Sequence, residues 1–164
     1  LTSLGTLADK IATTMWKVGG GSWSNIAESV PATAYQNEVV NPVTTNTTDN
    51  ATTYSAKIGL MYVSDYGFAA SPSAWTKNLF DYNSADVNGT SITTINWMYM
   101  GYNEWTISPY SSNSNVVFYL DGDGYVDNYP ADFGFGSRPV LYLKASVLYA
   151  GGLGTKDSPI TLVV

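Results

Sequence analysis

Four aspartates stand among glycines and tyrosines in the stretch YLDGDGYVDNYPAD, residues 119–132. Such a group of oxygen ligands suggests a calcium loop, because Ca²⁺ is held by several carboxylate and carbonyl oxygens. Counted from the first aspartate, the four occupy positions 1, 3, 7 and 12 of an EF-hand-like loop. Tyr125 and Val126 stand at positions 5 and 6, where such a loop has a ligand and a glycine. The candidate calcium ligands are Asp121, Asp123, Asp127 and Asp132.

The same stretch is also typical of a β-hairpin. An Asp-Gly pair between two strand-like runs, here residues 116–120 and 125–128, is a strong short-range hairpin signal. A hairpin turn explains the glycines without a metal ion. The sequence therefore requires no cofactor, and calcium remains the alternative.

Catalytic chemistry finds few candidate residues in this chain. Cysteine and histidine are both absent, which excludes thiol nucleophiles, disulfides, the usual zinc ligand sets and Ser-His-Asp triads. Glu104 with a nearby aspartate could form the carboxylate pair of a glycosidase, but the sequence offers no test of their separation. No lysine is marked as the partner of a serine nucleophile. We therefore expect no catalytic residues and no enzymatic activity.

Residues 102–136 have the composition of a binding surface. About half of them are Tyr, Asn, Ser or Asp. Tyrosine supplies a large contact area at a small entropic cost, and serine and asparagine supply adaptable hydrogen bonds, as in antibody paratopes. The alternative is a polar loop region beside an aromatic core. That core would contain Trp97, Trp105, Val117 and Phe118.

Apolar spacing predicts an amphipathic helix over residues 1–20, ended by the glycines at 19–21. It could also be the lower end of a longer helix that began before Leu1. Residues 21–164 are then one domain of short antiparallel strands joined by long loops, which makes the fold class α+β. The helix face is Leu4, Leu7, Ile11 and Met15, and the strand-like runs are residues 56–63, 96–108, 116–120, 125–128 and 138–144.

Two polar features lie at the ends of these predicted strands. Ser64 and Asp65 follow the run 56–63 and predict the start of a short helix. Arg138, the only arginine of the chain, precedes a proline at a strand start. We expect it to bind loop carbonyls or a carboxylate, as arginine does at structural sites.

The overall charge narrows the class of partner. The net charge is −6 and the seven basic residues form no cluster, so nucleic acid and anionic membrane surfaces are excluded as expected partners. Only 12% of residues are charged, against about a quarter in ordinary soluble domains, and Thr, Asn and Tyr take their place. No apolar run is long enough to cross a bilayer. We therefore predict an extracellular, cell-surface location.

Three segments together resemble a known fold family. Residues 101–106, GYNEWT, resemble the GNVWEWT segment of formylglycine-generating-enzyme-like domains. Residues 134–140, GFGSRPV, resemble the closing strand of those domains and of related bacterial surface domains. Residues 58–66, IGLMYVSDY, resemble the strand-to-helix segment of the latter. The resemblance covers residues 56–164 and implies a C-type-lectin-like fold, but not the enzymes' chemistry, which depends on cysteines.

Two further resemblances imply a setting. Residues 8–20, with the segments IGLMYVSDYG and RPVLYLKASVLY, resemble pilin-like proteins of gut Firmicutes. The residue set before the GSRP strand resembles variable proteins of diversity-generating retroelements, which display a mutable face on a lectin-like fold.

These resemblances imply a ligand-recognition domain that is displayed on a pilus and diversified in sequence. The expected partners are a protein or glycan at the cell surface and identical subunits of the pilus. The alternatives are a structural pilin subunit whose loops mediate packing, and a calcium-dependent lectin. The predicted binding face lies within residues 102–134. Its candidate residues are Tyr102, Asn103, Tyr110, Ser112, Asn113, Asn115, Tyr119, Asp121, Asp123, Tyr125, Asp127, Asn128, Tyr129, Asp132 and Phe133.

Overall fold

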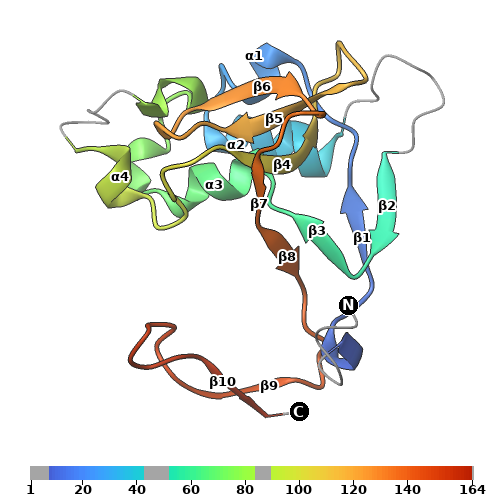
Figure 1. The fold of residues 1–164 in the computed structure, drawn as a ribbon, viewed down its shortest axis with the longest axis vertical. Coiled ribbons are helices and arrows are strands. Elements are labelled where there is room, and N and C mark those ends of the chain that lie inside the picture. Colours follow the sequence, from blue (N-terminus) through green and yellow to red (C-terminus); the bar gives the residue numbers. More distant parts are fainter. Residues whose placement is uncertain (1–7, 43–51, 84–89, 164) are drawn as a thin grey trace.

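The computed structural model describes residues 8–42, 52–83 and 90–163 (Figure 1). Short helices come mostly in the first part of the chain and only strands follow from Glu104, and the strands form one four-stranded sheet and three two-stranded sheets. The α+β class predicted from the sequence is confirmed. In the described ranges, no helix has the length and apolar character needed to cross a membrane.

The predicted N-terminal helix is wrong from residue 11 on, and of the described residues in it only 8–10 are helical, as one 3-10 turn. Strand β1, Thr14–Lys17, pairs antiparallel with β2, Thr53–Ala56. Exposure alternates along β1 as in a strand: Met15 is 65% exposed and Trp16 only 3%. The hydrogen bonds of this segment come from a strand some forty residues away, which local spacing cannot show. Leu4 and Leu7 lie outside the described residues.

The next part of the chain, residues 22–95, contributes the helices that pack against the main sheet. The Ser22 side chain accepts a hydrogen bond from the Asn25 N–H and caps the first helix, and Pro31 occupies the first turn of the second. The elements are α1 Trp23–Ile26, α2 Pro31–Tyr35, the π-helix η2 Gln36–Val40, α3 Val63–Ala69, the 3-10 helices η3 Pro72–Ala74 and η4 Leu79–Asn83, and α4 Ile92–Ile95.

The main sheet has the strand order β6-β5-β4-β7. Strands β5 and β6 form the predicted hairpin around the Asp-Gly turn, with Tyr119 opposite Asp127. Strand β7 lies parallel to β4, with Glu104 beside Gly136. The predicted strand 96–108 is shorter than expected and begins only at Glu104. The strands are β4 Glu104–Pro109, β5 Val116–Leu120, β6 Val126–Pro130 and β7 Gly136–Ser137.

The strands outside the main sheet are shorter than the sequence suggested. The predicted strand 56–63 is divided, since β2 ends at Ala56 and β3, Ile58–Leu60, pairs with a different partner. That partner is β8, Pro139–Leu141, which is the observed part of the predicted strand 138–144. Together β3 and β8 connect the main sheet to the β1-β2 pair (Figure 1).

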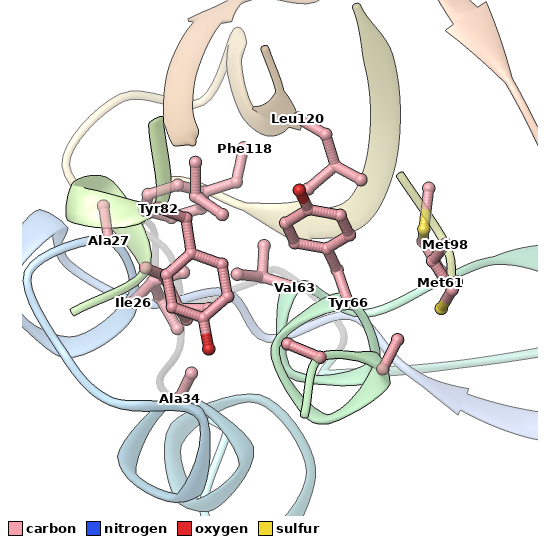
Figure 2. Close-up of a cluster of buried hydrophobic side chains, with 14 of the residues drawn as sticks. Ile26, Ala27, Ala34, Met61, Val63, Tyr66, Tyr82, Met98, Phe118 and Leu120 are labelled. Atoms are coloured by element: carbon pink, nitrogen blue, oxygen red, sulfur yellow. The ribbon is translucent and has the colours of Figure 1, made fainter. Parts of the chain in front are cut away.

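The hydrophobic core fills the space between the main sheet and the helices (Figure 2). Tyr66 from α3 and Tyr82 from η4 lie fully buried beside Phe118 of β5. Phe118 was predicted for the core correctly, whereas Trp97 is 78% exposed and that prediction is wrong. Its neighbour Met98 is the buried residue of the pair, because Asn96 and Met98 turn inward while the indole between them turns out.

The C-terminal hairpin projects away from this body (Figure 1). Strand β9, Leu148–Gly151, pairs with β10, Thr161–Val163. Apolar side chains on both strands and on the loop between them reach solvent; Leu153 is 82% exposed and Tyr149 65%. This hairpin therefore adds apolar surface to the molecule without adding to its core.

Candidate functional site

The alternation of side chains gives the main sheet two unlike faces. On β4, Glu104, Thr106 and Ser108 are buried and face the helices, whereas Trp105 lies on the opposite face and is half-buried. The register carries this alternation across the sheet, because Trp105 stands opposite Tyr119. We call the face toward the helices the inner face and the other the outer face.

Five aromatic rings gather on the outer face and are called the aromatic cluster. Phe135 lies at its centre, with its ring centroid 4.6 Å from that of Trp105 and 4.8 Å from that of Tyr119. Tyr129 contacts Phe133 edge-on at 4.5 Å. Such separations and tilts are those of favourable aromatic pairs. The members are Trp105, Tyr119, Tyr129, Phe133 and Phe135.

The rings of the aromatic cluster lie at different depths. Tyr119 is only 6% exposed and forms its floor. Tyr129 and Phe133 reach solvent, with 39% and 49% of their surface exposed. Large exposed aromatic rings resting on buried ones are already ordered before any partner arrives, so contact with a ligand would cost little side-chain entropy.

Carboxylates border the aromatic cluster at the end where the β5-β6 hairpin turns. The Asp121 carboxylate accepts hydrogen bonds from the Tyr119 hydroxyl at 3.4 Å and from the Asp123 N–H at 2.8 Å. Asp127 lies across the hairpin from Tyr119. Partial burial, together with the negative charge of Asp121, raises the pKa of Asp127 above its ordinary value.

The same surroundings act on the two neighbouring phenols. Burial raises the pKa of Tyr119 far above its ordinary value, and the charges of Asp127 and Asp121 raise it further. Burial and the Asp121 charge likewise raise the pKa of Tyr125. Both phenols therefore stay neutral in the ordinary pH range and remain able to donate hydrogen bonds. The outer face combines apolar rings with phenol donors and carboxylate acceptors.

The structure brings together part of the predicted binding set. Six of the predicted residues lie on or beside the outer face, where the hairpin register and the ring contacts place them. Tyr125 lies at the border, because its phenol lies beside Asp121 while its ring contacts Phe80 of η4 at 5.7 Å. The six are Tyr119, Asp121, Tyr125, Asp127, Tyr129 and Phe133.

The alternation of side chains between the two faces breaks at the β5-β6 turn. Tyr119 and Asp127 do share a face, as the alternation predicts. Asp123 instead lies exposed at the tip of the turn, where Gly124 adopts a φ of 100° and its N–H donates to the Asp121 carbonyl. A positive φ suits glycine and reverses the chain within two residues.

Several predicted residues lie elsewhere. The ring of Tyr110 packs edge-on against Phe118, 5.7 Å away, and so belongs to the core side. Asn128 stands opposite Phe118 in the register and thus shares the inner-face parity. The Asn103 side chain accepts from the Gly122 N–H at 2.8 Å and fixes the turn. For these three, the sequence-based assignment to a displayed face is not supported by their placement.

The remaining predicted residues are exposed but peripheral. Tyr102 precedes β4 and is 48% exposed. Asp132 lies in the turn after β6. The other three lie in the β4-β5 turn, at the end of the sheet away from Asp121, where the Asn115 carbonyl accepts from the Ala131 N–H. They are Ser112, Asn113 and Asn115.

Two members of the aromatic cluster were missed from the sequence. Trp105 was assigned to the core, and Phe135 was not assigned at all. The alternation of polar and apolar residues along 104–108 places Trp105 on the face opposite Glu104 and Thr106. Nothing in the local sequence shows that Phe135 reaches this face, because its position depends on the parallel pairing of β4 with β7.

The calcium interpretation is not supported by the geometry. Within the described residues, which include all four aspartates, no three acidic side chains come close enough together to hold a metal ion. The hairpin explains their spacing, because Asp123 sits at the tip of the turn, Asp132 lies in the turn beyond β6, and the other two flank Tyr119. The alternative interpretation of Asp121, Asp123, Asp127 and Asp132 as calcium ligands therefore has no support in their placement.

Glu104, the candidate catalytic carboxylate, has a structural partner. It is 2% exposed on the inner face and forms an ion pair with Arg138, whose Nε also donates to Glu104 Oε1 at 3.2 Å. Arg138 donates in addition to the Met98 carbonyl at 2.8 Å. The predicted role of Arg138, binding a loop carbonyl and a carboxylate, is confirmed.

Comparison with known proteins found no match: no protein-family model, no curated protein and no solved structure is significantly similar to this chain.

Proposed function

We propose that this chain is a ligand-recognition domain and that the outer face of its main sheet is the binding surface. The observation that carries the proposal is the aromatic cluster, where ordered rings reach solvent beside Asp121 and Asp127. Tyrosine is among the residues that dominate binding energy in protein interfaces, and phenylalanine is enriched in them. The ligand is a protein or glycan on a cell surface.

The proposed setting extends the resemblance found in the sequence. We assign the domain a C-type-lectin-like fold, an extracellular location and display on a pilus, with substitutions tolerated on the outer face. The α+β class and a sheet with exposed aromatic rings on its outer face are compatible with this assignment. Enzymatic activity is not part of the proposal, since the carboxylate first considered for it, Glu104, is engaged by Arg138.

Binding to cell-surface material tests the proposal. We would apply the labelled domain to a glycan array and to surface extracts of cells from its source community. The double variant Tyr129→Ser/Phe133→Ser removes the exposed rings and leaves the buried floor. The expected result is loss of the wild-type binding signal by about tenfold or more, as for a central anchor pair.

The matched control is Tyr149→Ser/Leu153→Ser on the C-terminal hairpin, which also removes one exposed aromatic and one exposed apolar side chain. It should bind as the wild type does. Equal binding by both double variants would show that the outer face is not the binding surface. Long-read sequencing of the gene from many cells tests diversification, which predicts substitutions at outer-face codons and an invariant inner face.

A second candidate function, a structural pilin subunit, is favoured by one observation. The C-terminal hairpin exposes Leu148, Tyr149, Leu153 and Ile160 at 51–82% and projects from the body. Apolar surface of this kind is typical of a protein interface. If the hairpin variant abolishes filament assembly by the complete protein while the outer-face variant assembles normally and no ligand is bound, the structural role is the stronger one.

A further inference from the structure

A pocket separate from the aromatic cluster combines a carboxylate with aromatic rings. It has a volume of about 400 Å³ and is lined by side chains from α3, β8 and the segment around residues 97–98. Phe68, Trp97 and Tyr142 contribute rings, and Asp65 contributes the one charged group of the lining. The floor is apolar, made by Met61 and Met98, which lie near each other at the edge of the core (Figure 2).

We propose that this pocket binds an alkylammonium group, such as the side chain of lysine, with the amine beside Asp65 and the hydrocarbon stem against the apolar floor. This second binding site does not depend on the function proposed for the outer face.

The carboxylate is available for such a ligand. Asp65 Oδ2 accepts a hydrogen bond from the Tyr62 N–H at 3.0 Å, which fixes the side chain in place. Asp65 forms no ion pair with any of the lysines or the arginine in the described ranges. Although the residue reaches solvent, the protein atoms around its carboxylate displace water and raise its pKa above the ordinary value. An arriving cation would offset this cost.

Ring contacts hold Phe68 and Tyr142 in position before any ligand binds. Trp75 contacts Phe68 edge-on at 5.4 Å, and the Trp75 indole N–H donates to the Ala70 carbonyl at 2.9 Å. Trp16 contacts Tyr142 at 5.5 Å. The Met98 N–H donates to the Asn96 side chain at 2.9 Å, which fixes the segment that carries Trp97. Faces of Trp, Tyr and Phe attract cations, most strongly Trp.

The charge of the whole chain favours a cation over an anion. The net charge is −6, so the field around the molecule concentrates positive groups. An anion would face Asp65 without a basic residue in the lining. A neutral apolar ligand would fit the floor but would leave the carboxylate desolvated and unpaired, which costs free energy.

Nuclear magnetic resonance titration of the full 15N-labelled chain tests the proposal. The probe is Nα-acetyl-lysine methylamide, and its matched control is Nα-acetyl-norleucine methylamide, which keeps the stem and lacks the ammonium group. The Trp97 indole N–H signal, assigned by its loss in Trp97→Phe, should shift with the lysine probe at concentrations about fivefold lower than with norleucine. Added salt should weaken only the lysine probe.

Two substitutions locate the interaction. Asp65→Asn keeps an acceptor for the Tyr62 N–H and removes the charge, so affinity for the lysine probe should fall about fivefold. The control Asp157→Asn makes the same charge change at an exposed site on the C-terminal hairpin and should leave affinity unchanged. Trp97→Ala changes a side chain that is 78% exposed, so it should fold normally. It lacks the indole signal, so its weaker binding of the probe is followed through the backbone amide of Met98, another residue of the lining.

The outcomes separate the possibilities. Equal affinity for lysine and norleucine probes, or unchanged affinity in Asp65→Asn, would overturn the proposal. Titration with n-butylammonium distinguishes two sources of the same chemistry. Affinity equal to that of the lysine probe indicates a free amine ligand, and weaker affinity indicates a lysine of a partner protein.

Discussion

The two faces of the main sheet differ in composition and in exposure, although the same strands form both. The inner face buries polar groups, and each has a partner: Thr106 donates to the Phe118 carbonyl at 2.7 Å, and Ser108 donates to Glu38. The outer face gathers aromatic rings and leaves several of them uncovered. Stability is therefore concentrated on the inner face, while the outer face holds surface that the fold itself does not need.

The largest expected effect comes from the inner face. Phe118→Ala removes a fully buried ring between Tyr110 and the core. Loss of its burial and the cavity left behind should lower the free energy of unfolding by about 3–5 kcal/mol. Urea denaturation followed by circular dichroism measures this change. A loss under about 1 kcal/mol would contradict the assignment of stability to the inner face.

Arg138→Met should lower the free energy of unfolding by about 3 kcal/mol, almost as much as Phe118→Ala. The substitution keeps an apolar side chain but leaves the Glu104 carboxylate buried without its cation. The same urea experiment measures it. Lys156→Met, on the exposed C-terminal hairpin, is the control for loss of one positive charge and should change stability by no more than about 0.5 kcal/mol.

Glu38→Gln should lower the free energy of unfolding by about 1–3 kcal/mol at neutral pH. The Glu38 carboxylate, 2% exposed, accepts from the Val63 and Ser64 N–H groups, both at 2.9 Å, and from the Ser108 hydroxyl. A glutamine offers one oxygen in place of two, so one of these donors would face an NH₂ group. Unfolding free energies of the two proteins at neutral pH measure the cost.

The Glu38 site also predicts a pH dependence. Burial raises the pKa of Glu38 above its ordinary 4.5, although the hydrogen bonds it accepts oppose this. The folded state therefore holds the proton more tightly than the unfolded state. The stability that this contributes is present below pH 4.5 and is lost as pH rises through the folded pKa. The difference in unfolding free energy between wild type and Glu38→Gln should fall over that range, and a rising difference would refute the sign.

The smallest expected effect is on the outer face. Phe133→Ala removes a ring that is 49% exposed and contacts mainly Tyr129 and Phe135. It should lower the free energy of unfolding by no more than about 1 kcal/mol. Compared with Phe118→Ala under the same conditions, it measures the difference between the two faces directly. Equal losses would mean that the aromatic cluster is a second core.

What the sequence could predict was local. The β5-β6 hairpin followed from the Asp-Gly turn between two strand-like runs. Ser64 and Asp65 predicted the helix α3, although it begins at Val63 with Tyr62 as its N-cap. The N-terminal helix failed because residues 14–17 pair with residues 53–56, a partner that helical spacing cannot reveal. The presence of Phe135 in the aromatic cluster and the pocket beside Asp65 both depend on contacts between distant segments.

The segment before β1 pairs with the chain just beyond β8, and this pairing has a mechanical consequence. Ile11 pairs antiparallel with Leu143, and hydrogen bonds from Ala12 to Tyr142 and from Lys144 to Lys10 extend this pairing. Residues 10 and 144 are thus neighbours. A force that pulls residues 10 and 144 apart would break these hydrogen bonds one after another before it acted on the core. We therefore expect the pairing of residues 10–12 with residues 142–144 to separate first under force, while both faces of the main sheet stay intact.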